Sequence, residues 1–151
     1  MKPNTDLKVL LGPSKFSSTG YLGIDTREPE DIIKEDLQTL KNLGIDRKKL
    51  IAALRNAYVA AERAMGNPVD IADGVSAVHH EARGKISSPF SEDGTCQKGE
   101  AVITDKKSGE TFIITPLSIM LIERHDFFQG KGSPYRTDPQ VIVKLLGIKE
   151  K

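Results

Sequence analysis

The chain has 151 residues, of which 38% are hydrophobic and 28% are charged, a composition typical of a folded globular domain. Its formal net charge of +1 excludes the large positive excess on which general nucleic-acid binding depends. The apolar runs are too short for a signal peptide or for a membrane helix, which needs roughly 18 residues, so we expect a cytoplasmic protein. Because Cys96 is the one cysteine, an internal disulfide and a thiolate metal cluster are also excluded.

The first part of the chain, residues 1–24, is rich in Gly, Pro, Ser and Thr. These residue types favour turns and extended segments over packed helices. We therefore predict an extended N-terminal arm over residues 1–24, followed by a single domain over residues 25–151.

Two helices are predicted to open this domain. The first begins around Thr26 to Pro29, where a capping residue, acidic side chains and an early proline favour initiation, and it ends at Gly44. The second begins with Asp46 as the N-cap and ends at Gly66. Because the joint between them is short, the two helices should form a helical hairpin.

The two predicted helices differ in charge. Residues 25–46 carry seven acidic and three basic side chains, whereas residues 47–68 carry five basic side chains and one acidic. Exposed ion pairs are common and are each worth only about 0 to 1 kcal/mol. We therefore interpret the difference as mutual solvation of the hairpin rather than as a docking surface.

After Pro68 the hydrophobic pattern changes from helical to strand-like. Asp73 and Gly74 indicate a turn between strands, and a break at Gly84 interrupts the pairing. A polar, glycine-containing loop over residues 106–110 is typical of a β-hairpin. The predicted strands cover residues 69–81, 85–86, 100–105 and 111–115.

Two more helices are predicted near the end of the chain. One begins at Thr115 or Pro116, and its apolar residues indicate a buried helix. The other begins at Asp138 with Pro139 in its first turn and ends at Gly147. Strands that cluster in the middle without β-α-β alternation favour an antiparallel sheet. The fold class we predict is α+β, with an N-terminal helical hairpin, a central antiparallel β-meander, a buried helix packed on the sheet and a short C-terminal helix.

Two irregular segments, residues 87–99 and 129–137, are the predicted positions of a site, because loops on a rigid scaffold commonly carry function. In the second segment, two glycines can turn backbone amides inward, while Lys131, Ser133 and Arg136 add donors for an anion. Lys98 in the first segment and His125 at a helix end complete the predicted ligand-binding set.

A structural interpretation of the second segment is favoured over the anion-binding one, because glycine-rich turns are common and short basic turns are weak signals. It places a glycine at the end of a helix after Phe128, a turn at Ser133 and Pro134, and Arg136 in an ion pair with Asp138 or against helix carbonyls. Under either interpretation, Phe127 and Phe128 are expected in the core.

Three histidines suggest an enzymatic alternative. On a strand, His79 and Glu81 share one face, so a metal would need these two side chains and a third ligand such as His125. Cys96 could serve as a nucleophile with a histidine as its base, although the local signatures of cysteine hydrolases are absent. No catalytic, cofactor or metal motif is specific enough to assign, and we expect no cofactor.

The leading functional prediction is a binding or adaptor module that holds an anionic small molecule or a protein partner through residues 87–99 and 129–137. The first alternative is a hydrolase-like enzyme that uses His79, Glu81 and His125, with or without a metal or Cys96. The second alternative is a structural subunit of a homo-oligomer. Neither nucleic acid nor membrane is expected as a partner.

Overall fold

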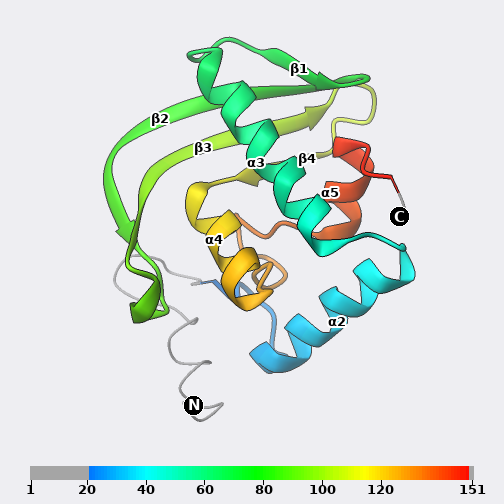
Figure 1. Ribbon diagram of the computed structural model, residues 1–151, viewed down its shortest axis with the longest axis vertical. Helices are drawn as coiled ribbons and strands as arrows, with labels where there is room; N and C mark the ends of the chain where they lie inside the picture. Colours follow the sequence, from blue (N-terminus) through cyan, green and yellow to red (C-terminus); the bar gives the residue numbers. More distant parts are fainter. Residues whose placement is uncertain (1–20, 150–151) are drawn as a thin grey trace.

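The computed structural model describes residues 21–149 and confirms the predicted α+β fold class (Figure 1). Two helices come first, a block of four strands follows, and two helices end the described chain. The elements are α2 (Pro29–Asn42), α3 (Arg47–Arg63), β1 (Val69–Ala72), β2 (Val75–Ser87), β3 (Thr95–Asp105), β4 (Thr111–Ile114), α4 (Pro116–His125) and α5 (Pro139–Leu146), with a short 3-10 turn at Ser91–Asp93.

The strands form one antiparallel sheet in the order β1-β2-β3-β4, which is the predicted β-meander. Helices α3, α4 and α5 pack on one face of this sheet (Figure 1). Ala77, Ala101 and Ile103 are completely buried, whereas their strand neighbours Val78 and Val102 are only partly buried. This two-residue period is that of a sheet with one face covered by helices.

Strands β2 and β3 extend beyond the sheet as a curved two-stranded arm (Figure 1). We call residues 81–87 of β2 and 95–99 of β3 the β2–β3 arm. Strand β1 pairs with β2 only as far as Ala77, and β4 pairs with β3 only from Ala101 to Thr104, so the arm has no further strand beside it. A β-bulge between Glu81 and Lys85 bends it.

The arm changes one prediction. Residues 95–99 belong to β3, so the irregular connection that was predicted over residues 87–99 shrinks to residues 88–94. The sequence pattern missed this part of the strand because much of the arm is exposed, with polar side chains such as Gln97 and Lys98 at successive positions. Strand periodicity is visible in a sequence only where one face is buried.

The core has two clusters, and α4 contributes to both. One lies between α3, α5 and the sheet and includes Leu54 and Phe128, while the other lies beside α2 and includes Leu121 and Phe127. Phe127 and Phe128 are 0% and 1% exposed, which confirms that they are core residues. The two adjacent rings therefore connect the chain after α4 to both halves of the core.

Helix α4 starts as predicted but ends earlier. Thr115 is its N-cap, and its hydroxyl accepts a hydrogen bond from the Ser118 amide at 2.9 Å. The helix ends with Asp126 in the left-handed conformation, not with a glycine after Phe128. The side chain of Arg47 stabilises this end by binding the Asp126 carboxylate and the carbonyl of Ile122, the latter at 3.2 Å.

The ends of the described chain complete the fold. Tyr21 and Leu22, in the last part of the predicted arm, pack against the core, and Leu22 is buried, whereas Ile24 is exposed. The rest of that predicted arm, residues 1–20, lies outside the described residues. Within residues 21–149, none of the helices has the length and apolar character needed to cross a membrane.

Candidate functional site

In the turn over residues 129–137, Arg136 is part of the core structure. Its guanidinium donates two hydrogen bonds to the carboxylate of Asp36 on α2, at 2.9 and 3.0 Å, and one to the carbonyl of Gln129 at 2.6 Å. The side chains of Arg136 and Asp36 are only 11% and 6% exposed. Asp138, the partner considered from the sequence, lies farther away at 3.6 Å. The main donors of Arg136 are therefore already used within the protein.

The Ser133 hydroxyl and the Lys131 backbone amide are engaged as well, whereas the exposed ammonium group of Lys131 has no carboxylate partner among the described residues. The buried hydroxyl of Ser133 donates to the side-chain oxygen of Gln129 at 2.8 Å, and the amide of Lys131 donates to the Asp25 carboxylate at 3.1 Å. A Cβ on Gly130 would lie 2.2 Å from the carbonyl oxygen of Leu22, so glycine is needed there for close backbone contact. The turn thus binds the segment around Leu22 and Asp25.

His125 lies at the tip of the β2–β3 arm. Its Nε2 is 2.9 Å from the carboxylate of Asp93, and its ring stacks on Phe90 with ring centroids 3.7 Å apart. The Asp93 side chain is 1% exposed and also accepts a hydrogen bond from the Ser88 hydroxyl at 2.8 Å. His125 therefore holds the connection between the two strands against the end of α4.

The predicted enzymatic set comes together only in part: His79, Glu81 and Cys96 line one groove, described below, whereas His125 does not. Across residues 21–149, the potential metal ligands that gather in threes within 4.8 Å are Glu92, Asp93 and His125, a group without His79 and Glu81. The thiol of Cys96 lies 3.7 Å from the Met120 sulfur, and burial is the main cause that raises the pKa of this thiol. Cys96 is therefore a protonated core thiol rather than an activated nucleophile.

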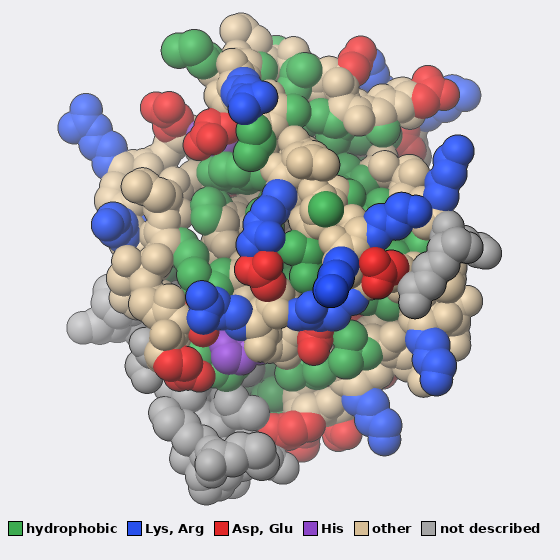
Figure 2. All heavy atoms as spheres, in the orientation of Figure 1, with side chains coloured by type: hydrophobic (Ala, Val, Ile, Leu, Met, Phe, Trp, Pro, Cys, Tyr) green, Lys and Arg blue, Asp and Glu red, His purple; other side chains and the backbone are tan. Residues whose placement is uncertain are grey.

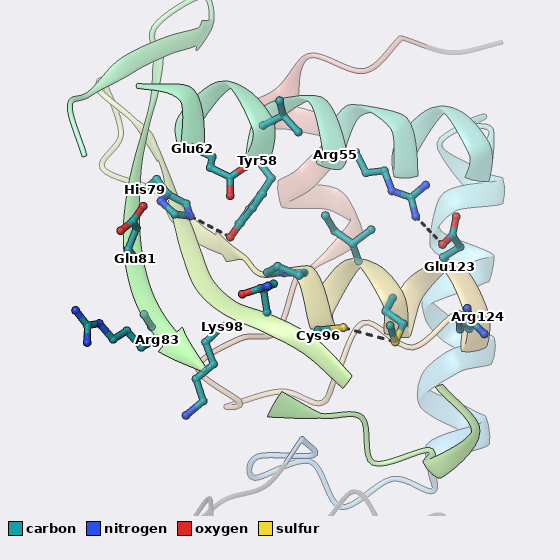
Figure 3. A pocket seen from close by; sticks show the side chains of 16 residues that line it. Arg55, Tyr58, Glu62, His79, Glu81, Arg83, Cys96, Lys98, Glu123 and Arg124 are labelled. Atoms are coloured by element: carbon teal, nitrogen blue, oxygen red, sulfur yellow. Dashed lines mark hydrogen bonds and ion pairs between the residues drawn. The ribbon is translucent and has the colours of Figure 1, made fainter. Parts of the chain in front are cut away.

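A groove of about 1060 Å³ lies between α3, α4 and the β2–β3 arm (Figure 3). Its apolar side chains include Val59 from α3 and Ile119 and Met120 from α4. Lys98, one of the predicted ligand-binding residues, lines it, whereas His125, Lys131, Ser133 and Arg136 do not. The two predicted loops therefore do not jointly form this groove.

A buried pair of polar rings lies along the groove (Figure 3). The hydroxyl of Tyr58 on α3 is 3.0 Å from Nε2 of His79 on β2, and the rings meet edge to face. Both rings pack against Gly99, where a Cβ would lie 2.8 Å from the tyrosine oxygen. Burial, with a smaller contribution from Glu62, raises the pKa of Tyr58, so this hydroxyl stays protonated. The pair joins α3 to the sheet.

Four cations line the groove, and they differ in their partners. Arg55 forms an ion pair with Glu123 at 2.6 Å, and Arg124 lies 3.9 Å from Asp93. Arg83 and Lys98 are exposed and have no carboxylate partner among the described residues. Figure 3 shows these two extending from the arm, on the side of the groove away from Arg55.

The sequence did not indicate Arg55, Arg83 or Arg124. Arg83 directly precedes Gly84, which looked like a break between strands rather than a bulge inside one. Arg55 belongs to the basic helix whose charge was interpreted as solvation of the helical hairpin. Instead, the ion pairs that the structure gives to α3 run from Arg47 and Arg55 to residues in and just after α4.

A second, smaller hollow of about 440 Å³ adjoins the groove along α3. It is lined by the helix residues Lys48, Ile51, Ala52 and Asn56, and it shares Arg55 and Glu123 with the groove. The Arg55–Glu123 ion pair therefore lies between two neighbouring hollows.

Comparisons with known proteins reveal no relative of this chain. No protein-family model matches the sequence. No curated protein matches it, and neither does any solved structure. The groove therefore has to be interpreted from its own chemistry.

Proposed function

We propose that this protein is a binding module that holds an anionic ligand with an apolar body in the groove between α3, α4 and the β2–β3 arm. Lys98 and Arg83 would bind the anionic group, while Val59, Ile119 and Met120 would contact the apolar part. The proposal keeps Lys98 from the sequence-based prediction and replaces the residues of the turn over 129–137.

The observation that carries the proposal is that Arg83 and Lys98 lie at the edge of a partly apolar groove and have no carboxylate partner within residues 21–149. Ligand sites combine apolar walls with a few polar groups that fix orientation, and this groove has that composition. A ligand that covers the apolar wall also removes water from the nearby charges, which strengthens their attraction for an anion.

Binding is favoured over hydrolysis because the groove lacks an activated nucleophile. Its cysteine thiol has a raised pKa, and the Nε2 atom of His79 is already paired with the Tyr58 hydroxyl. A nucleophile and its base need to lie within hydrogen-bonding distance of each other; the described groove residues with this geometry are Tyr58 and His79, and burial raises the pKa of the Tyr58 hydroxyl. The homo-oligomer alternative stays a prediction.

The proposal can be tested with anilinonaphthalene sulfonate, a fluorescent probe that joins an aromatic body to one anionic group. We expect the folded protein to bind this probe, and the Arg83→Ala, Lys98→Ala double variant to bind it at least about tenfold more weakly, a loss of about 1.4 kcal/mol. The matched control is Lys107→Ala, which removes an exposed cation from the β3–β4 turn and should leave probe affinity unchanged.

Cooperative thermal unfolding has to be recorded for each variant, because partly unfolded proteins also bind this probe. If the double variant is folded and binds the probe as tightly as the parent, the proposed function is wrong. The same conclusion holds if Lys107→Ala weakens binding as much as the double variant does.

A further inference from the structure

We infer that the natural ligand is an acidic, extended segment of a protein partner, which follows α3 from the groove across the Arg55–Glu123 ion pair into the second hollow. This inference rests on the proposed function and adds the class and the path of the ligand. Its starting point is that the two hollows share Arg55 and Glu123.

The length of the combined surface suits a peptide better than a small molecule. Lys48 lines the second hollow and Glu62 lines the groove, and both belong to α3. At 1.5 Å per helical residue, these two positions lie about 21 Å apart along the helix axis. An extended chain rises about 3.3 Å per residue, so six or seven peptide residues would cover that length.

The cations are spread along this path instead of being gathered at one point. Lys48 is exposed and without an ion-pair partner in the described part of the chain. Arg55 and Arg124 lie on the two helices, and Arg83 and Lys98 lie on the arm (Figure 3). A ligand with several spaced negative charges can contact all of these cations, whereas a compact anion can contact only some of them.

The surface between the cations is apolar in places. Val59 is 39% exposed, and Ala52 is also exposed on the same helix. Figure 2 shows hydrophobic side chains among charged ones of both signs on the face that carries α3 and α4. Acidic side chains that alternate with apolar ones would complement this pattern.

A nucleic acid fits the same surface less well. Glu62, Glu81 and Glu123 line the groove beside the cations, and they would repel a continuous phosphate backbone more than a peptide whose acidic residues alternate with apolar ones. Binding of single strands also relies on exposed aromatic rings for base stacking. The lining tyrosine, Tyr58, is 8% exposed and packs edge to face on His79, so its ring is not available as a stacking platform.

The test uses fluorescence anisotropy with a labelled heptapeptide in which Glu or Asp alternates with Leu. A peptide with Lys in place of each acidic residue is the charge control, and a labelled oligouridylate of similar length represents nucleic acid. We expect the acidic peptide to bind more tightly than both other probes, with an affinity that falls as salt is added.

The path is tested by Ala52→Glu, which places bulk and negative charge in the second hollow. We expect this variant to weaken binding of the acidic peptide by about tenfold. It should leave the affinity for anilinonaphthalene sulfonate unchanged, because that probe needs only the groove. The matched control is Gln140→Glu, which adds the same charge at an exposed position of α5 outside both hollows and should change neither affinity.

The outcomes separate the two proposals. If the sulfonate probe depends on Arg83 and Lys98 but Ala52→Glu leaves peptide affinity unchanged, the proposed function stands and the extended path is wrong. Absence of peptide binding, or tighter binding of oligouridylate, likewise overturns the peptide inference alone. If neither the sulfonate probe nor the peptide responds to loss of Arg83 and Lys98, the proposed function fails as well.

Discussion

The turn over residues 129–137 and the groove beside the β2–β3 arm both carry cations that a sequence would offer as anion-binding groups. In the turn, Arg136 is 11% exposed and forms a bidentate pair with a carboxylate that is 6% exposed. In the groove, Arg83 and Lys98 are exposed and unpartnered within residues 21–149. Arg136 therefore stabilises the fold in the turn, whereas Arg83 and Lys98 in the groove, like Lys131 in the turn, have no carboxylate partner within the described residues.

The difference between the two regions shows that residue type is a weaker guide to function than burial and pairing. A buried arginine is kept charged by its carboxylate partner, and removing either member leaves an uncompensated charge in the interior. An exposed cation has no such constraint, so its replacement should leave stability nearly unchanged. Stability measurements can therefore separate structural from ligand-binding cations.

The largest expected effect is that of Arg136→Ala. This variant would leave the buried carboxylate of Asp36 without its bidentate partner, and we expect the free energy of unfolding to fall by about 3 to 5 kcal/mol. Urea denaturation measures this loss. Combining Arg136→Met with Asp36→Leu removes both charges and should recover much of the stability. A loss below about 1 kcal/mol for Arg136→Ala would contradict the structural role of Arg136.

A smaller loss of stability is expected on acidification, through Asp25, whose carboxylate is bound by the turn over residues 129–137. Chiefly through its hydrogen bonds from Arg27, and with a further hydrogen bond from the Lys131 amide, the fold holds the pKa of Asp25 well below its ordinary value. Because the folded-state pKa is lowered, this carboxylate stabilises the fold above its unfolded-state pKa, near pH 4. That contribution is lost as the pH falls further toward the folded-state pKa.

Urea denaturation at several pH values between about 7 and 2 measures this dependence. We expect Asp25→Asn to be less stable than the parent at neutral pH and to lose less stability below pH 4. The matched control is Asp73→Asn, at an exposed turn position between β1 and β2. An unchanged acid dependence in Asp25→Asn would show that this carboxylate does not stabilise the turn.

The smallest effect on stability is expected when the exposed cations of the groove are replaced. The Arg83→Ala, Lys98→Ala double variant should change the free energy of unfolding by no more than about 0.5 kcal/mol, because neither side chain has a carboxylate partner to lose among the described residues. The same variant is the one expected to lose ligand affinity. If it instead destabilised the protein as strongly as Arg136→Ala, the distinction between the two regions would disappear.

Much of the fold could be predicted from the sequence because its elements carry local signals. Thr115 and Asp138 cap their helices as predicted, and each is followed by a proline in the first turn. The glycine-containing loop over residues 106–110 connects β3 to β4 as a hairpin. These features depend on neighbours in the chain, so a sequence records them directly.

Much less of the candidate site could be predicted from the sequence. Lys98 is the one predicted ligand-binding residue that lines the groove, because the groove joins α3, α4 and the arm, which are distant in sequence. The β-bulge at Gly84 concealed the continuity of β2, and with it the position of Arg83. The pairing of Arg136 with Asp36, one hundred positions away, likewise has no local pattern in the sequence.

The sequence by itself determined the order and type of the elements, the antiparallel sheet and the burial of Phe127 and Phe128, because periodicity, caps and turn residues act over short distances. Only the tertiary structure decided which charges are used internally and which remain free. That decision depends on contacts between distant segments: Asp36 reaches Arg136, whereas no described carboxylate reaches Arg83 or Lys98. Burial and ion pairing, rather than residue type, distinguish the cations that stabilise the fold from those of the candidate site.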